Sequence, residues 1–220
     1  MWCVPVLNDE YIERMEDILE VYERPLSYKE PVVCMDEKPI QLLKNISPTS
    51  RIPFPCKIGR KDYEYKRKGT ASAFCAIEPL KGKHLISVSK TRKSRDFALF
   101  LREISRSYPN ADKIHLIMDN LNTHRLKSLT THLGEKRGVK LWARFDVHYT
   151  PKHASWLNQA ETLISMYSRE CLGKDRIASI ATLKKRSSAW ARRATLDRRK
   201  INWKFTRAKA RKTFDYYMTQ

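Results

Sequence analysis

The stretch Ile114-His115-Leu116-Ile117-Met118-Asp119-Asn120 decides the fold of this chain. A short apolar run that ends in a carboxylate is typical of a strand buried on both faces of a sheet. Open α/β sheets place their functional groups at the carboxyl ends of such strands, which makes Asp119 a candidate site residue. The alternative is an Asx turn or a helix N-cap, because Asn122 and Thr123 follow closely.

A second apolar run, Pro31-Val32-Val33-Cys34-Met35-Asp36-Glu37, also ends in an acid. A third acid, Glu161, lies near the start of a helix predicted at residues 155–171. Neighbouring strands that end at Asp36 and Asp119 bring their carboxylates close together, and a helix on the same edge of the sheet adds Glu161. Three clustered carboxylates repel one another strongly unless a cation lies among them.

Such a group of carboxylates predicts a metal site. Hard oxygen ligands suit Mg²⁺ or Mn²⁺, which keep water ligands and bind substrate phosphate. Two such ions about 4 Å apart activate an attacking water or 3′-hydroxyl and stabilise the leaving oxygen. Glu37 is the rival of Asp36, and by strand alternation it points to the opposite face. The alternative for the whole trio is scattered capping and surface acids, because short motifs often match by chance.

The chain carries a large excess of positive charge. It has 44 Lys and Arg against 24 Asp and Glu, a net charge of +20. An excess of this size indicates a polyanionic partner, most simply nucleic acid. Residues 184–212 hold thirteen Lys or Arg and one acid, with aromatic residues in or beside them. This mixture suits phosphate contacts plus base stacking. The alternative is a solvated helical face whose aromatics pack on the body, and we expect both to hold.

Other features of the composition bear on the cellular compartment. No apolar run approaches the roughly 18 residues of a membrane span. Five cysteines, odd in number and far apart in sequence, argue against a disulfide framework and for a reducing compartment. The first residues lack the pattern of a signal peptide. We therefore expect a soluble, cytoplasmic protein without membrane association.

Hydrophobic periodicity and turn signals predict a mixed α/β fold. We expect a helical lead-in and linker at residues 1–30, one mixed α/β domain at 31–173, and a basic helical tail containing aromatics at 174–220. Within these, the expected helices are 8–22, 94–108, 123–133 and 155–171. The expected strands are 31–37, 63–67, 71–77, 84–89, 114–119 and 139–149, and residues 38–60 are expected to form a loop or inserted arm.

Five segments together resemble one known family, the bacterial insertion-sequence transposases related to mariner. In chain order they are Val33-Cys34-Met35-Asp36-Glu37-Lys38, Asp62-Tyr63-Glu64-Tyr65-Lys66-Arg67, Asp119-Asn120-Leu121-Asn122-Thr123-His124, His148-Tyr149-Thr150-Pro151-Lys152-His153 and Ser155-Trp156-Leu157-Asn158-Gln159-Ala160-Glu161. The resemblance runs from about residue 2 to the C-terminus. It implies a DDE catalytic domain, a DDE superfamily endonuclease with a ribonuclease-H-like fold.

The resemblance also implies functional residues. Asp36, Asp119 and Glu161 are then the catalytic, metal-binding triad, holding two Mg²⁺ ions for which Mn²⁺ substitutes. Asn158 fits the family's Asn-x-x-Glu pattern. Members of the family cut transposon ends by metal-dependent hydrolysis and join the 3′-hydroxyl to target DNA, so the expected partners are transposon-end and target DNA. The implied assembly is a homodimer, and the implied location is the bacterial nucleoid.

Four further residues are weaker candidates. Asn120 and His124 match the family's residues after the second Asp, and we expect them to orient Asp119 or to contact phosphate. The alternative for His124 is a satisfied histidine at a helix start. Lys152 and His153 precede Glu161 and are candidates for DNA contact, with a solvated loop as the alternative.

The sequence also departs from the family pattern. No helix-turn-helix pattern precedes Asp36, although family members usually carry one that recognises transposon ends. Ala154 replaces the usual glycine, the run after Glu161 is atypical, and Ala194 stands where Asn is common. We therefore expect the catalytic half of a split or frame-shifted element, with a separately encoded helix-turn-helix subunit as a possible partner. The alternatives are a catalytically impaired DNA-binding remnant and a nuclease without strand transfer.

Overall fold

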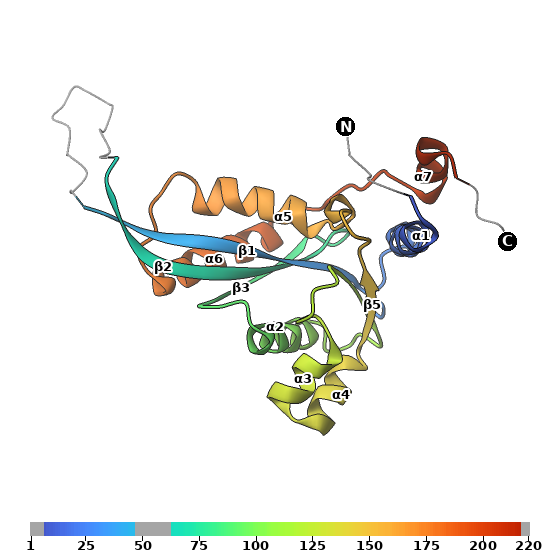
Figure 1. The fold of residues 1–220 in the computed structure, drawn as a ribbon, viewed down its shortest axis with the longest axis horizontal. Coiled ribbons are helices and arrows are strands. Elements are labelled where there is room, and N and C mark those ends of the chain that lie inside the picture. Colours follow the sequence, from blue (N-terminus) through green and yellow to red (C-terminus); the bar gives the residue numbers. More distant parts are fainter. Residues whose placement is uncertain (1–6, 47–62, 217–220) are drawn as a thin grey trace.

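The computed structural model describes residues 7–46 and 63–216. Its centre is a five-stranded sheet of order β3-β2-β1-β4-β5 (Figure 1). The strands are β1 (Val32–Asn45), β2 (Tyr65–Glu78), β3 (Lys83–Ser89), β4 (Ile114–Met118) and β5 (Phe145–Tyr149). β1, β2 and β3 pair antiparallel, whereas β1, β4 and β5 pair parallel. This confirms the predicted mixed α/β sheet.

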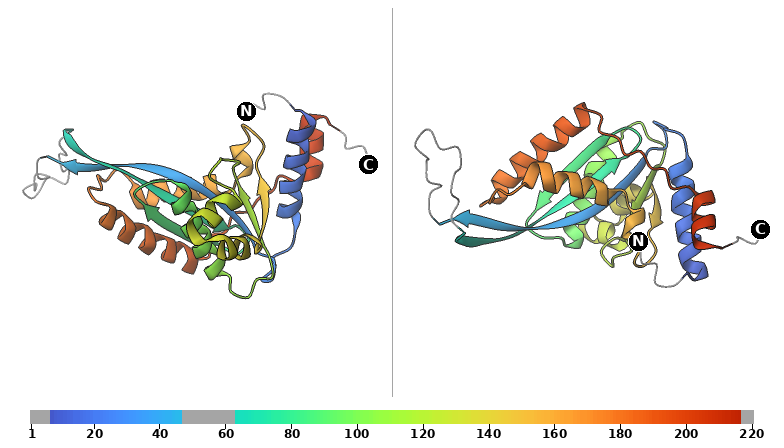
Figure 2. Two further views of the ribbon diagram at one scale, coloured as in Figure 1. Left: turned by 60° about the horizontal axis from the view of Figure 1, so that its bottom comes forward. Right: turned by 90° about the horizontal axis from the view of Figure 1, so that it is seen from above.

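Helices cover both faces of the sheet. α2 (Ser94–Ser107), α3 (Leu126–Leu133) and α4 (Glu135–Trp142) lie on one side, and α5 (Ala160–Tyr167) and α6 (Ile180–Leu196) lie on the other (Figure 1). On this second side α1 (Asp9–Glu23) covers the end of the sheet near β5, and α7 (Arg207–Phe214) lies beside α1 (Figure 2).

The buried strand β4 supplies both cores, as its unbroken apolar run predicts. All five of its residues are buried. Leu116 and Met118 join the core under α2, whereas Ile117 joins the core under α1, α5 and α6. His115 shares the face of Ile117, because alternate residues of a strand point to the same side. The second face therefore carries a polar side chain in a buried position.

The first strand is longer than predicted. β1 does not end at Asp36 but continues to Asn45, and β2 is one strand where two strands and a turn at residues 68–69 were expected. Gly69 has a positive φ of 97°, and the β1–β2 register shifts between Gln41 and Leu43, which marks a bulge rather than a turn. The rest of the predicted loop or arm, residues 47–62, lies outside the described residues.

The segment between β4 and β5 also differs from expectation. The helix predicted at 123–133 begins at Leu126, and the first part of the strand predicted at 139–149 belongs to α4. Gly134 separates the two helices with a φ of 84°. Gly138 lets them approach closely, because a Cβ on it would lie 2.6 Å from the main-chain nitrogen of Thr130.

The predicted helix at 155–171 is divided into three parts. A 3-10 turn spans Ser155–Leu157, α5 follows from Ala160, and a π turn over Ser168–Leu172 ends at Gly173. The helices expected at 8–22 and 94–108 are confirmed as α1 and α2, each within about one residue of the predicted ends.

The basic C-terminal region turns its aromatic residues inward. Trp190 and Tyr216 are buried, and Trp203, Phe205 and Phe214 pack against the same core, as expected. This core contains residues of α1, the sheet, α5, α6 and α7, so the region packs on the body. The proposed divisions at residues 30 and 173 stay predictions. Among the helices of the described residues, none is long and apolar enough to cross a bilayer.

Candidate active site

Two of the predicted metal-binding acids lie on adjacent parallel strands. Cys34 of β1 pairs with Ile117 of β4. Asp36 lies two residues beyond the first and Asp119 two residues beyond the second, so both acids follow the paired part of the two strands on the same side. Asp119 follows the last residue of β4, as predicted, whereas Asp36 lies inside β1.

The third acid, Glu161, lies in the first turn of α5 and is exposed. The buried Asn158 positions this turn. Its Nδ2 donates to the main-chain oxygen of Met35 at 2.8 Å, and its Oδ1 accepts from the main-chain nitrogen of Ala160 at 3.1 Å. The second bond forms an Asx turn that leads into α5, and the first ties that turn to the residue before Asp36. Asn158 therefore links the elements that carry Glu161 and Asp36.

The charges of the three acids act on one another. Burial is the largest cause of a raised pKa at Asp36, and the negative charges of Glu161, Asp119 and Glu37 add to it. The Asp36 carboxylate accepts a hydrogen bond from the main-chain nitrogen of Glu37 at 2.7 Å, which acts in the opposite direction, and the resulting pKa is about 7. Acids from three separate elements thus converge closely enough to oppose one another's ionisation, which is the electrostatic condition that a bound cation relieves.

His124 joins two acids beside this group. It is 1% exposed, and its Nδ1 lies 2.6 Å from Oδ1 of Asp119 while its Nε2 lies 2.9 Å from Oε1 of Glu37. Its ring stacks on Phe97 with centroids 4.5 Å apart. Burial alone would lower the pKa of His124, but the two carboxylates outweigh burial and raise it to about 9. His124 therefore contacts Asp119, one of the two expected roles, and is too buried to face a phosphate.

Glu37 belongs to this pair with His124 rather than to the group around Asp36. Its side chain is 6% exposed and bonded to the His124 ring. The sequence argument that Glu37 and Asp36 point to opposite faces of β1 agrees with this arrangement.

The remaining predicted residues are exposed. Asn120 follows Asp119 in the loop after β4. Lys152 and His153 lie in the loop after β5, and His153 has a positive φ of 61°. These two line a hollow of about 280 Å³ together with Tyr11 and other residues at the start of α1. The structure therefore brings Lys152 and His153 to α1.

The residues around Asp119 fit a divalent cation. Oδ1 of Asp119 is buried and accepts no hydrogen bond of good geometry within the described residues. Although His124 Nδ1 is close to it, that nitrogen bonds to the main-chain oxygen of Asp119 at 3.1 Å. The Asp119 carboxylate, held by this close contact with His124, forms together with the carboxylates of Asp36 and Glu161 a donor set that suits Mg²⁺ or Mn²⁺.

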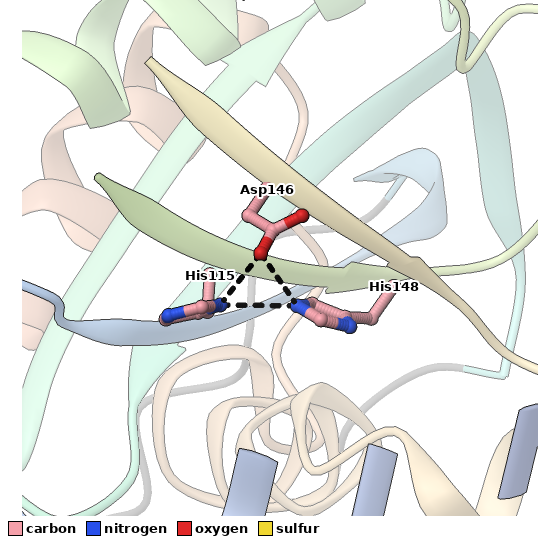
Figure 3. A group of neighbouring side chains, drawn as sticks. All are labelled: His115, Asp146 and His148. Carbon is pink, nitrogen blue, oxygen red and sulfur yellow. Dashed lines mark hydrogen bonds and ion pairs between the residues drawn. The ribbon is translucent and has the colours of Figure 1, made fainter. Parts of the chain in front are cut away.

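Sequence reasoning missed a second group of metal-ligating residue types, His115, Asp146 and His148 (Figure 3). Asp146 and His148 alternate along β5, which puts them on one face, but only the β4–β5 register reveals His115 beside them. The sequence alone therefore indicated two of the three residues, Asp146 and His148, but not that His115 lies beside them.

The fold and the converging acids define a class, the ribonuclease-H-like α/β proteins with a carboxylate site at the sheet. The family model of the DDE superfamily endonucleases matches residues 31–184, and the chain belongs to this family. The matched range contains Asp36, Asp119 and Glu161. A search of curated proteins finds no match.

Solved structures agree with this assignment. A pre-cleavage Mos1 transpososome superposes with a TM-score of 0.58 at 17% sequence identity. The match includes 100% of this chain and 67% of the Mos1 chain. The Mos1 mariner paired-end complex with Mn and the Mos1 strand transfer complex each give a TM-score of 0.55 at 16% identity over 90% of this chain. The chain spans 62% and 61% of these two proteins. The predicted family resemblance and ribonuclease-H-like fold are confirmed.

Proposed function

We propose that this chain is the catalytic domain of a transposase that cleaves transposon-end DNA and joins the new 3′-hydroxyl to target DNA. Asp36, Asp119 and Glu161 bind two divalent cations, Mg²⁺ or Mn²⁺. The observation that carries the proposal is electrostatic: the charges of Glu161 on α5 and of Asp119 at the end of β4 both raise the pKa of Asp36 on β1.

The chain's own residues hold this geometry. Asn158 fixes the start of α5 against β1, and His124 holds Asp119 from the buried side. The cations, when bound, activate the attacking oxygen and stabilise the leaving oxygen of the phosphodiester. The carboxylates remain ionised beside the cations, since a nearby positive charge favours the charged form of an acid.

The substrate follows from charge. Acidic metal ligands in a chain of net charge +20 suit a polyanion whose phosphates are held by basic residues and cut at the metal site. The finer parts of the proposal are a homodimer that holds two transposon ends, a helix-turn-helix region or separate subunit that recognises them, and association with the nucleoid. The solved Mos1 complexes with DNA ends support DNA as the partner.

The test is nicking of supercoiled plasmid by the full chain with Mg²⁺, Mn²⁺ or Ca²⁺. Wild type is expected to nick with Mg²⁺ and Mn²⁺, and Asp119→Asn or Glu161→Gln is expected to abolish nicking. Both variants should bind DNA at least as well as wild type, because each removes a negative charge near the backbone. Joined products from a donor with matched ends separate strand transfer from simple hydrolysis.

Glu170→Gln is the matched control. Glu170 lies on the same helical segment as Glu161, but it accepts from Trp190 Nε1 at 3.0 Å and pairs with Arg199, so its carboxylate is already bound. This variant should nick as wild type does. If Glu161→Gln nicks normally, the third metal ligand is wrongly assigned. If no protein nicks while DNA binding persists, the alternative of an impaired DNA-binding remnant is favoured.

A further inference from the structure

A second cluster of ligand side chains lies on the face of β4 and β5 that α1 covers (Figure 3). His115 pairs directly with Asp146 across the two strands, and His148 lies two residues further along β5, so all three share one face. His115 Nδ1 is 3.1 Å from His148 Nε2 and 3.4 Å from Asp146 Oδ2, and the latter two atoms are 3.8 Å apart.

The size of this triangle matches a tetrahedral ion. Zinc binds imidazole nitrogen and carboxylate oxygen at about 2.0–2.1 Å, so two ligands of a tetrahedral site lie about 3.3–3.4 Å apart. The three distances lie around this value. Two imidazoles and one carboxylate also form a donor set that zinc uses with a fourth, open position.

Asp17 of α1 holds the His148 ring in the tautomer that can bind a metal ion. Nδ1 of His148 lies 2.7 Å from Oδ2 of Asp17. A carboxylate only accepts at neutral pH, so Nδ1 carries the proton and the lone pair of Nε2 faces the other two ligands. A carboxylate behind a ligating histidine fixes the ring and increases its basicity.

Arg24 competes with metal binding, because its hydrogen bond to His115 favours the tautomer of that ring that cannot bind the ion. Its Nη1 lies 2.7 Å from Nε2 of His115. Because arginine only donates, Nε2 accepts and Nδ1 carries the proton, which then donates to His148. Without metal, the four side chains thus form a satisfied chain of hydrogen bonds from Arg24 to Asp17. With metal, Nδ1 of His115 must give up its proton and Nε2 must carry one, so Arg24 must turn away.

When Arg24 turns away from His115, Glu20 is available as its partner. The Arg24 side chain is 39% exposed and already lies 3.5 Å from Glu20. The competing hydrogen bond therefore sets the affinity for metal without blocking the site.

We propose that His115, Asp146 and His148 bind Zn²⁺ at a site separate from the carboxylate triad, with Asp17 as the positioning residue and Arg24 as the competitor. Imidazole ligands select zinc over Mg²⁺, whereas the all-carboxylate triad selects Mg²⁺. His115 and Asp119 are four residues apart in sequence, about 13 Å along a strand. The bound ion joins β4 to β5 on the face of the sheet that α1 covers.

The test is calorimetric titration of the full chain with Zn²⁺ in excess Mg²⁺, which occupies the triad. Co²⁺ is the second probe, because its visible absorption is intense in tetrahedral sites. One Zn²⁺ per chain is expected. Asp146→Asn changes a side chain that is 54% exposed and should weaken binding at least about tenfold, and Asp17→Asn should weaken it about 10–100-fold.

Two further variants sharpen the test. Arg24→Gln should tighten Zn²⁺ binding, because the glutamine carbonyl accepts from a protonated Nε2 of His115. His132→Ala removes an exposed histidine outside the cluster and should change nothing. The proposal is overturned if wild type binds no Zn²⁺, or if Asp146→Asn and His148→Gln bind it as wild type does, which would place the ion on other residues such as the cysteines.

Discussion

Asn158 donates from Nδ2 to the main-chain oxygen of Met35 at 2.8 Å, and so ties the start of α5 to the residue before Asp36. The same side chain accepts from the nitrogen of Ala160, the first residue of α5, at 3.1 Å. One amide therefore sets the position of Glu161 relative to the strand that carries Asp36. The distance between two proposed metal ligands depends on a residue that need not touch the metal.

Replacing Asn158 with Ala should impair catalysis more than it impairs folding. The change leaves two buried main-chain groups without a partner, which costs about 1–3 kcal/mol of unfolding free energy. A displaced Glu161 should slow nicking by about 100-fold, the effect of a misplacement of about 1 Å. Urea unfolding and plasmid nicking measure the two effects. Asn110→Ala, in an exposed turn, is the control. Wild-type nicking by Asn158→Ala would refute the positioning role.

Replacing His124 with Phe tests the buried contact between Glu37 and Asp119. Phe retains the ring that stacks on Phe97 but removes both nitrogens. The buried Glu37 carboxylate then lacks a cationic partner, and breaking a buried pair in this way costs about 3–5 kcal/mol. Thermal and urea unfolding should show a large loss of stability, whereas His132→Phe at an exposed site should show little. Equal stability of the two variants would contradict the ion-pair assignment.

Glu16 should make the docking of α7 dependent on pH. The side chain is 8% exposed, and Arg211 binds it through two hydrogen bonds of 2.8 and 2.7 Å. Burial raises the pKa of Glu16, but bonds from Arg211 and Tyr216 outweigh burial and lower it. Because the folded pKa lies below the unfolded value, about 4.3, the stabilisation is full above that value and is lost as pH falls through the folded pKa.

The corresponding variant is Glu16→Gln. At neutral pH it should lower the unfolding free energy by about 1.5–3 kcal/mol, the range for hydrogen bonds to charged groups. The difference from wild type should shrink on acidification, as followed by thermal unfolding at several pH values. Glu10→Gln breaks an exposed pair with Arg14 and should cost less than about 1 kcal/mol. A difference that persists in acid would show that Glu16 acts through its shape rather than its charge.

Gly138→Ala should destabilise the chain even though alanine favours helices by about 1 kcal/mol. Its Cβ would lie 2.6 Å from the nitrogen of Thr130, so α3 and α4 must move apart. Overpacking of this kind costs about 1–3 kcal/mol. Lys140→Ala on the exposed side of α4 is the control for helix propensity. If Gly138→Ala is more stable than wild type, α3 and α4 can move apart at little cost in free energy.

The sequence predicted the buried centre of the fold better than its extensions. β4 was located to within one residue, because its apolar run is buried on both faces and bounded by polar residues. The extension of β1 past Glu37 was missed because Pro39 reads as a strand breaker. The pairing of β1 with β4 is recorded only as far as Cys34, so β1 has an open edge beyond it, where a proline is tolerated.

Some residues of the candidate site could be predicted from the local sequence, whereas others could not. Asp119 and Glu161 could be found from their positions at an element's end or start. The partnership of His124 with Glu37 could not, because it joins residues 87 apart in sequence whose proximity depends on the sheet register. The cluster of His115, Asp146 and His148 was missed for the same physical reason. Pairing between strands is not encoded in the local pattern of either strand.

The contact between Arg211 and Glu16 joins residues 195 positions apart. A contact of such sequence separation requires closure of nearly the whole chain, and closure of long loops is slow. During synthesis α1 leaves the ribosome early and must wait with Glu16 unpaired until α7 has been made. The docking of α7 on α1 is therefore among the last steps of folding, and a chain released before residue 207 keeps an uncovered α1.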